Sequence, residues 1–274
     1  MEIVLWGCRG GIPVSGREYV EFGGNTPCIQ IKTPQTEFII DAGTGIRELG
    51  NMASIQEKKN FNFLFTHVHW DHILGLPFFR PIYEGATLEI FYNFQVQGDV
   101  VEYILDLFRK PYFPVEKQEV ESRFISRPVD FPFKKEDLEI EAIPISHPDS
   151  GLGYKFKYNG KTFVYLTDNE LEFNHVNSKS YEEYLEFCFS ADLLIHDAEY
   201  LSQEYKRTKG WGHSRMEAVL EFAFNAKVKS LGLFHHSQNR KDDELLKLER
   251  SFQLLGKSKG LHIFMTRQGQ SLML

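Results

Sequence analysis

The sequence of 274 residues has few cysteines, no excess of positive charge and no long apolar run. Cys8, Cys28 and Cys188 cannot close a disulfide set, which excludes a small disulfide-stapled fold and favours a reducing compartment. With 38 acidic and 31 basic residues the net charge is −7, which disfavours a general coat for long polyanions. No stretch approaches the roughly 18 apolar residues that a membrane-spanning helix needs. We therefore expect a cytoplasmic protein with no membrane partner.

What the chain does have is the composition of a folded domain with a large core, since 42% of its residues are hydrophobic. No linker, repeat or low-complexity tract divides it, so we expect one domain over residues 1–274. Short strand-like runs span residues 2–6, 28–33, 37–41, 61–66, 87–92, 139–143, 154–158, 162–167, 193–196, 230–234, 261–265 and 271–274. Helical stripes lie between the later runs, which indicates an α/β fold of packed sheets covered by helices.

Three of the expected helices carry signals at their ends. Ser180 with Glu183, and Ser214 with Glu217, have the spacing of capping boxes ahead of an apolar stripe. A third stripe runs up to Gly256, which we expect to end its helix.

The segment 94–135 is less regular than the rest of the chain. It combines an expected helix over residues 100–108 with several prolines and aromatics. Two interpretations of this insert stay open. It is either a lid or dimer contact that covers a pocket, or a surface excursion that packs its own aromatics.

The most informative segment is THVHWDH, residues 66–72, which follows the apolar run 61–65. Three imidazoles and a carboxylate this close together are costly to bury without a shared counter-charge. A divalent metal supplies that charge, and this donor set suits zinc, iron or manganese. In an extended chain His67 and His69 point the same way, while Asp71 and His72 lie past the turn and can reach a second ion.

Residues of ligand type also follow other predicted strands. His147 comes after the run that begins at residue 139, Asp168 follows residues 162–167, and His235 follows residues 230–234. His236 competes with His235 for one role, and we prefer His235 because it comes immediately after the strand. Asp41 also ends a strand, where it either orients a ligating histidine or serves only a turn.

The order HxHxDH, then His, Asp and His, resembles that of the metallo-β-lactamase-fold hydrolases over nearly the whole chain. The resemblance implies an αββα sandwich, two mixed β-sheets flanked by helices, with two divalent ions at one edge; zinc is expected, with manganese or iron as alternatives. Carried over by residue, it implies two ligand sets and a bridge: His67, His69 and His147 for one ion, Asp71, His72 and His235 for the other, and Asp168 between them.

Two further segments resemble the phosphodiesterase branch of that family, which includes the tRNA 3′-processing endonucleases. Residues 196–199, HDAE, and residues 212–214, GHS, are similar to its His-Glu-Ala-Thr and Gly-His-Ser motifs, with Asp197 in place of glutamate and Glu199 in place of threonine. Residues 6–13 and 22–26 also resemble the bacterial cyclic-nucleotide-phosphodiesterase-like group.

These resemblances imply roles for three catalytic residues. His213, expected beside the helix N-terminus that Ser214 caps, would bind the substrate phosphate and protonate the leaving alkoxide. Asp197 would orient His213. Asp71 would help to position a metal-bound hydroxide for attack at phosphorus.

The family's tRNA enzymes carry a long arm between the third and fourth metal motifs. Here His147 and Asp168 are only 21 residues apart, and the chain is acidic. We therefore expect a metal-dependent phosphodiesterase that converts a small phosphodiester, a cyclic nucleotide, to its mononucleotide and does not act on long nucleic acid. The family resemblance also implies a homodimer.

Two alternatives stay open. A thioesterase, lactonase or glyoxalase-type hydrolase would use the same metals but leave Asp197 and His213 without a task. A nucleotide-binding sink without turnover would have no need for an activated hydroxide. The sequence names neither the base, nor the ring type, nor the native metal.

Overall fold

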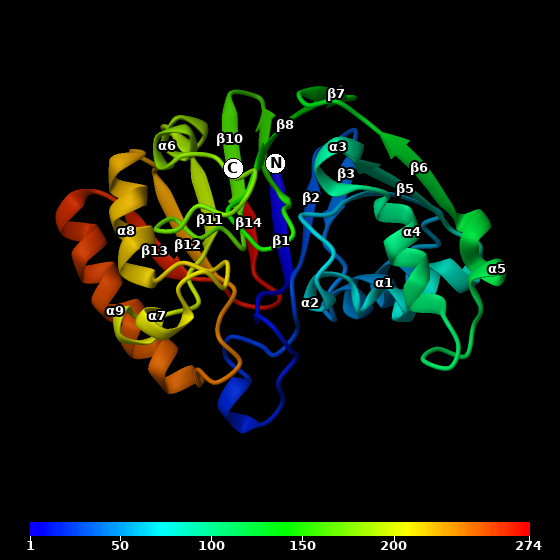
Figure 1. Cartoon of the computed structure of the whole chain (residues 1–274), viewed down its shortest axis with the longest axis horizontal. Coiled ribbons are helices and arrows are strands. Elements are labelled where there is room, and N and C mark those ends of the chain that lie inside the picture. Colours follow the sequence, from blue (N-terminus) through cyan, green and yellow to red (C-terminus); the bar gives the residue numbers. More distant parts are fainter.

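Alternating apolar residues build two β-sheets that pack face to face, as Figure 1 shows for the computed structural model of residues 1–274. The first sheet has the order β14 (Ser271–Met273), β1 (Glu2–Gly7), β2 (Cys28–Lys32), β3 (Glu37–Ile40), β4 (Asn60–Leu64), β5 (Thr87–Tyr92), β6 (Phe124–Pro128). The second has the order β13 (His262–Met265), β12 (Ser230–Phe234), β11 (Leu193–Asp197), β10 (Lys161–Leu166), β9 (Leu152–Tyr158), β8 (Leu138–Pro144), β7 (Phe133–Lys135). Both are mixed, because β3 to β6 and β10 to β13 run parallel while the other neighbours are antiparallel.

Helices lie outside both sheets (Figure 1). Beside the first sheet are α1 (Ile46–Ile55), α2 (Trp70–Ile73), α3 (Phe94–Gln97), α4 (Val100–Leu105) and α5 (Lys117–Val120). Beside the second are α6 (Tyr181–Cys188), α7 (Ser202–Thr208), α8 (Met216–Asn225) and α9 (Asp242–Lys259). Short 3-10 turns occupy Arg17–Tyr19, Leu76–Phe78, Arg80–Glu84, Asp106–Phe108 and Glu121–Arg123. This arrangement confirms the predicted αββα sandwich. None of these helices has both the length and the apolar character that crossing a membrane requires.

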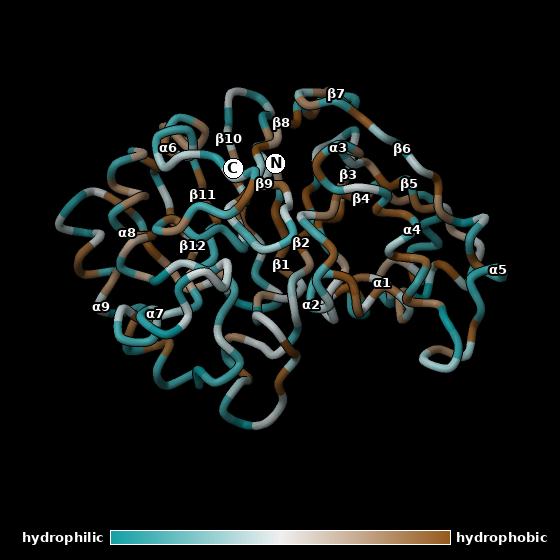
Figure 2. Tube along the Cα trace, viewed as in Figure 1, coloured by the Kyte–Doolittle hydropathy of each residue, from teal (hydrophilic) through white to brown (hydrophobic).

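Strand β2 shows how the residue pattern creates the layers. Ile29 and Ile31 pack between the two sheets, whereas Cys28 faces the opposite way, into the cluster that includes residues of α1. A period of two residues places alternate side chains on opposite faces. In Figure 2 the hydrophobic colour follows strands such as β1, while the chain around α7 is hydrophilic. Cys8, Cys28 and Cys188 are buried and unpaired, as expected for core thiols.

One predicted helix start is confirmed and one is wrong. The Ser180 hydroxyl accepts from the Glu183 N–H at 3.2 Å, and Glu183 accepts from the Ser180 N–H at 2.8 Å, so α6 begins with a capping box. Ser214 does not cap α8, which begins at Met216. Its buried hydroxyl instead donates to the Asn169 carbonyl at 2.7 Å and accepts from the Leu171 N–H at 3.0 Å. The Ser214 hydroxyl therefore binds the turn after β10 and not the first N–H groups of α8.

Gly256 does not end α9, which continues to Lys259 and stops at Gly260 with φ of 75°. A Cβ on Gly256 would lie 2.4 Å from the Leu261 carbonyl oxygen. The glycine at 256 thus permits close packing of the helix against the following strand, while Gly260 provides the left-handed ending.

The insert 94–135 contains more regular structure than its sequence indicates. After α3, α4 and α5, the strand β6 pairs with β5 at the edge of the first sheet, and β7 then pairs with β8 in the second. The segment thus carries the chain from one sheet to the other (Figure 1). Both strands are short and lie at sheet edges, where prolines and polar residues weaken the strand pattern. A role as lid or dimer contact stays a prediction.

Candidate metal centre

The residues of ligand type lie at the carboxyl ends of the parallel strands, where binding sites of open α/β sheets lie. Asp41 follows β3, Asp168 follows β10 by two residues, and His235 follows β12. Their φ angles are 61°, 52° and 58°. This left-handed conformation is strained for a residue other than glycine, and such strain concentrates at functional sites. It turns the chain sharply at each strand end.

The structure brings all seven predicted ligands into one cluster. The two predicted triads, His67–His69–His147 and Asp71–His72–His235, each have their donor atoms within 4.8 Å of one another. Asp168 lies between them. Its Oδ2 is 3.4 Å from His72 Nε2, 3.5 Å from His235 Nε2, 3.7 Å from His67 Nε2 and 3.9 Å from His147 Nε2.

These donors fit a pair of divalent ions. Nε2 of His67 and of His72 is buried and has no hydrogen-bond partner, an arrangement that folded proteins avoid unless something else binds there. Two ligands that are each about 2.1 Å from one ion lie roughly 3.4 Å apart at the tetrahedral angle. The separations around Asp168 Oδ2 are of this size. The imidazole and carboxylate cluster therefore suggests a dinuclear centre whose metal the donor set alone does not specify.

The charges in the cluster also favour a bound cation. Burial lowers the pKa of His67 well below its ordinary value and that of His147 to about 3, so both rings are neutral, the form that binds metals. Burial acts in the same direction on His72, but the carboxylates of Asp168 and Asp71 outweigh it and raise the pKa of that ring. Protons and metal ions compete for such nitrogens.

Hydrogen bonds from the outer nitrogen fix the direction in which three of the rings face. His72 Nδ1 donates to Asp41 Oδ2 at 2.8 Å, His147 Nδ1 donates to the Gly212 carbonyl at 3.0 Å, and His235 Nδ1 donates to Glu199 Oε2 at 3.0 Å. Each bond occupies Nδ1 and turns Nε2 toward the other predicted ligands, the orientation that metal binding requires. Asp41 is fully buried and contacts a predicted ligand, which favours an orienting role over that of a plain turn residue.

His236 faces away from the cluster. Its Nε2 donates to the Thr266 carbonyl at 2.8 Å, and its ring meets the edge of Phe22. Of the two neighbouring histidines, the structure places only His235 among the other predicted ligands.

His213 lies against the cluster on the side of the second sheet. Its ring stacks on His235, with centroids 4.6 Å apart, and its Nδ1 is 3.9 Å from Asp168 Oδ2. Burial lowers the pKa of His213, but the nearby carboxylates of Glu199 and Asp197 outweigh it and raise that pKa above its ordinary value. The ring is therefore suited to hold a proton beside the cluster.

Asp197 is close to His213 but does not hydrogen-bond to it. Its Oδ2 lies 3.6 Å from His213 Nδ1 and accepts from the Ser214 N–H at 2.9 Å, while its Oδ1 accepts from the Asn169 N–H at 2.9 Å. Asp197 thus fixes the backbone next to His213. The expected helix N-terminus is also absent at His213, because α8 begins three residues later.

The sequence motifs gave no role to Glu199, but in the structure this residue contacts two histidines of the site. Its Oε2 accepts from His235 and lies 3.7 Å from His213 Nε2, so it contacts both rings. The spacing of Glu199 could have indicated this role. It stands two residues after Asp197, which ends β11, and in an extended chain side chains two residues apart point to the same face.

The glycines near the N-terminus also contribute to the site. The Gly11 N–H donates to Asp71 Oδ2 at 2.9 Å. A Cβ on Gly10 would lie 2.2 Å from His235 Nδ1. These residues therefore pack directly on two predicted ligands, and the family-like segment 6–13 has a structural reason for its glycines.

We expect Gly212→Ala to lower both the metal content and the activity. A Cβ at this position would lie 1.9 Å from His147 Nδ1, and the φ of 94° disfavours any side chain. Displacing a ligating histidine or its partner typically lowers metal affinity or activity about 10- to 100-fold. The measurement is metal content per chain by elemental analysis, together with kcat.

Gly210→Ala is the matched control for that variant. Gly210 has a similar φ of 87°, but a Cβ there would meet only the Phe173 ring at 3.7 Å. This variant should keep its metal. Equal losses in both would attribute the effect to loop strain and not to His147.

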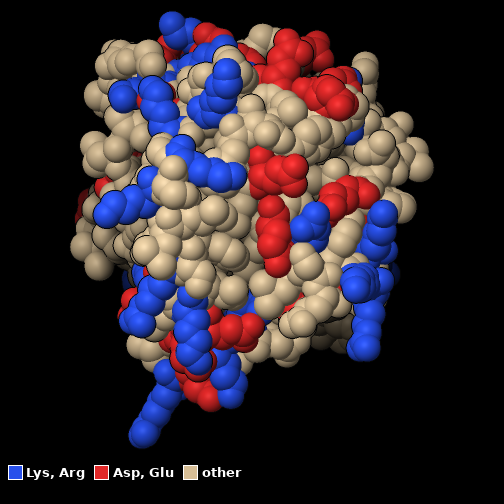
Figure 3. Space-filling view, turned by 90° about the vertical axis from the view of Figure 1, so that its left-hand side faces the viewer, with Lys and Arg blue, Asp and Glu red and all other residues tan.

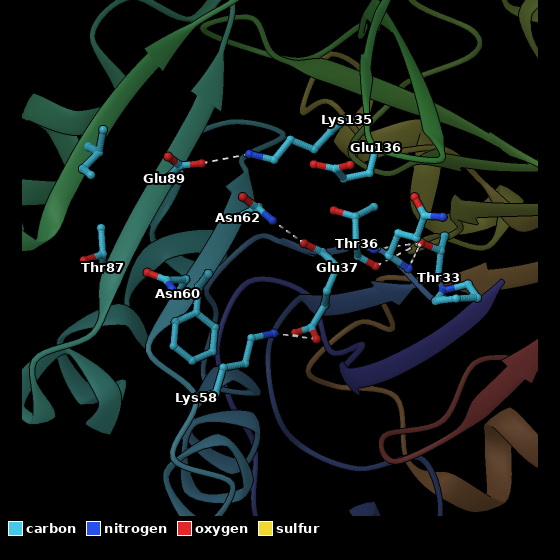
Figure 4. A pocket seen from close by; sticks show the side chains of 14 residues that line it. Thr33, Thr36, Glu37, Lys58, Asn60, Asn62, Thr87, Glu89, Lys135 and Glu136 are labelled. Atoms are coloured by element: carbon cyan, nitrogen blue, oxygen red, sulfur yellow. Dashed lines mark hydrogen bonds and ion pairs between the residues drawn. The ribbon is translucent and has the colours of Figure 1, made fainter.

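A different hollow, of about 720 Å³, lies at the amino ends of β4 and β5 (Figure 4). Four of its charged side chains form two ion pairs: Lys58 with Glu37 at 2.6 Å, and Lys135 with Glu89 at 3.0 Å. None of the predicted ligands lines it. We assign no function to it.

Comparisons with known proteins agree with this fold. A family model described as β-lactamase superfamily domain matches residues 36–236. Ribonuclease Z of Exiguobacterium sibiricum is 24% identical over 281 residues, which cover 89% of this chain and 91% of that protein. Ribonuclease Z of Thermococcus sibiricus is 27% identical over 298 residues, or 89% of each chain.

Solved structures show the same fold. The metallo-β-lactamase fold protein YhfI of Bacillus subtilis has a TM-score of 0.69 at 17% identity and covers 99% of this chain and 98% of its own. A diphosphatase of the PhnP family scores 0.69 at 18% identity, over 100% of this chain and 97% of its own. The short form of human tRNase Z scores 0.66 at 16% identity, over 100% and 99%. With its family model, its αββα layers and its clustered histidines and aspartates, this chain belongs to the β-lactamase superfamily.

Proposed function

We propose that this chain is a metal-dependent phosphodiesterase that hydrolyses a small phosphodiester, a cyclic nucleotide, to its mononucleotide. The observation that carries the proposal is the placement of His213 against the Asp168 side of the cluster, between the carboxylates of Asp197 and Glu199. An alkoxide is a poor leaving group and needs a proton, whereas the thiolate that leaves a thioester departs without one. Relatives named ribonuclease Z and a PhnP-family diphosphatase support phosphoester chemistry.

The mechanism divides the work among this chain's residues. The predicted triads and Asp168 would hold two divalent ions, zinc in our proposal, with manganese or iron as alternatives, and such ions supply Lewis acidity and an activated nucleophile. Gly11 fixes Asp71 through its N–H, so that this carboxylate can orient the attacking group. Nδ1 of His213 is buried, so Nε2 is the nitrogen that would give its proton to the leaving oxygen.

Two features favour a small substrate over a long one. Residues between His147 and Asp168 are taken up by the β9–β10 hairpin, which leaves no room for an extended arm. The net charge is −7, and on the face in Figure 3, the side that carries α8 and α9, Lys and Arg are interspersed with Asp and Glu. A polynucleotide usually needs a continuous basic surface.

A second candidate is an RNA endonuclease. It is favoured by relatives named ribonuclease Z that match about nine-tenths of this chain. The same His213 and ligand cluster would serve it, so only the substrate separates the two candidates.

The deciding experiment is turnover by the metal-loaded protein on a panel. The panel holds 3′,5′- and 2′,3′-cyclic nucleotides, cyclic dinucleotides, an aryl phosphodiester, a tRNA precursor with a 3′ trailer, and a thioester. Asp71→Ala runs alongside to exclude contaminating activity.

Turnover of a cyclic nucleotide that the variant lacks supports the proposal. Cleavage of the tRNA precursor alone selects the endonuclease, and thioester turnover without diester cleavage overturns the phosphodiesterase assignment. Nucleotide retention without turnover would indicate a sink.

We also propose a homodimer, in keeping with the family resemblance, with residues 94–135 near the site or the dimer contact. The α3 residue Gln97 supports the first placement, because it donates to the Phe65 carbonyl at 2.6 Å, at the start of the HxHxDH segment. Light scattering tests the dimer, and a monomer at all concentrations contradicts it.

A further inference from the structure

A cavity of about 550 Å³ opens directly beside His147. Val96 of α3 forms one side, residues 148–150 form another, and residues 175–177 form a third. Its size lies in the range of small-ligand pockets, typically about 300–1,000 Å³, and suits a nucleoside. No step of the mechanism above uses it.

We propose that this cavity is the subsite for the nucleoside moiety of the substrate, and that Asp149 accepts hydrogen bonds from its hydroxyl or amino groups. The inference rests on the proposed phosphodiesterase function and adds to it the part of the substrate that does not react. Binding energy from such remote groups positions the reacting centre.

The cavity is connected to the predicted metal centre through shared lining residues. Asp149 Oδ2 lies 3.8 Å from His69 Nε2. A small hollow of about 40 Å³ lined by His67, His69 and Gln97 also includes Asp149 and Ser150. A ligand in the cavity could therefore extend to the ions without leaving the surface of the chain.

The turn that carries Asp149 is fixed by backbone contacts. Asp149 and Ser150 have φ of 63° and 72°, and the Ser150 N–H donates to the His147 carbonyl at 3.2 Å. Just beyond, the Leu152 N–H donates to the Thr66 carbonyl at 2.8 Å. The turn is thus tied to a predicted ligand on one side and to the start of the HxHxDH segment on the other. Asp tolerates this left-handed backbone better than most residues.

Asp149 has no basic partner in this turn. Its side chain is 93% exposed, and the imidazole of His69 is the one basic side chain within 4.0 Å of its carboxylate. A free carboxylate accepts hydrogen bonds from hydroxyl or amino groups and repels additional phosphates. This chemistry favours a nucleoside over a polyphosphate or a second phosphodiester at this position.

Val96 and Val176 offer apolar contact from the other walls, and the amide of Asn177 lies beside Val176. Val176 is 83% exposed. His175 is held through both ring nitrogens, by Ser146 Oγ and by the Gly210 carbonyl, each at 3.1 Å, so neither nitrogen is free for a ligand. An uncharged ring could pack on Val176 while its polar groups donate hydrogen bonds to Asp149.

The test compares two substrates with the same leaving group, thymidine 5′-p-nitrophenyl phosphate and methyl p-nitrophenyl phosphate. Asp149→Gly removes the carboxylate at a φ that glycine accepts, and Asp149→Asn keeps one acceptor oxygen. We expect Asp149→Gly to lower the kcat/KM ratio of nucleoside to methyl substrate about tenfold, mainly through KM, in line with a lost hydrogen bond to a charged group. Asp149→Asn should lose less.

Asn159→Gly is the matched control, because Asn159 is exposed, has φ of 48° and lies at the far end of β9. It should leave the substrate ratio as in the original protein. Equal losses on both substrates in Asp149→Gly would overturn the inference and assign the residue to the chemistry or to the turn.

Calorimetric titration with AMP separates this inference from the proposed function. If neither p-nitrophenyl diester nor any cyclic nucleotide of the panel is hydrolysed, the proposed function fails, and the titration still decides on the cavity. Binding of AMP that weakens about tenfold in Asp149→Gly, but not in Asn159→Gly, supports the subsite. Absent binding, or equal binding in both variants, overturns it.

Discussion

His213→Ala is expected to lower kcat/KM by about a thousandfold for a diester with an alkoxide leaving group, because general acids contribute about 10²–10⁴-fold. The loss for a p-nitrophenyl diester should be about tenfold, since that anion leaves without a proton. The prediction rests on the position of the ring, 3.9 Å from Asp168 Oδ2 and between two carboxylates. The measurement is kcat/KM for a cyclic nucleotide and an aryl diester under identical metal loading.

Metal content is the control for this variant. His213 belongs to neither predicted triad, so His213→Ala should keep the metal content of the original protein. Equal losses on the two substrates would mean that His213 binds the phosphate and does not donate the proton. A fall in metal content would instead place it among the ligands.

Asp168→Asn is expected to abolish the dinuclear centre, with metal content falling below one ion per chain and activity falling at least a thousandfold. The amide keeps the size of the side chain and tolerates the φ of 52°, but it removes the negative charge that faces the imidazoles of four predicted ligands and of His213. Without that charge, two cations at short separation have no shared counter-charge.

Comparing this variant with the original protein also tests how metal removal affects stability. Ions that bind only the native state stabilise it by about 4 kcal/mol when their concentration is 1,000 times Kd. A chelator should therefore lower the melting temperature of the original protein markedly and that of Asp168→Asn very little. A variant that keeps two ions per chain, or that responds to the chelator like the original, contradicts the bridging role.

Much of the fold and of the site could be predicted because the signals are local. Strands such as β5 and β12 have apolar runs with clear ends, and their bounds in the structure match those expected. The ligand-type residues stand at such ends, and a short strand followed by a fixed turn gives its last residues one direction. The order of the ligand motifs along the chain was enough to indicate the family.

What the sequence could not indicate depends on segments that meet only in the folded chain. Glu199 acquires its role by contacting His235, 36 residues away, and Gly212 by receiving the hydrogen bond of His147, 65 residues away. Ser214 looked like a helix cap because that signal is local, but a more distant turn took its hydroxyl.

The sequence by itself indicated two packed sheets through its periodicity, and its motifs indicated the ligand types and the class of chemistry through their resemblance to the family. Only the tertiary structure decided which histidine joins the cluster, how Asp197 acts on its neighbours and where a cavity opens beside His147. Contacts such as that of His235 with Asp71, 164 residues apart, depend on how two sheets pack. Packing is set by the sum of many side-chain contacts, and no single segment of the sequence encodes it.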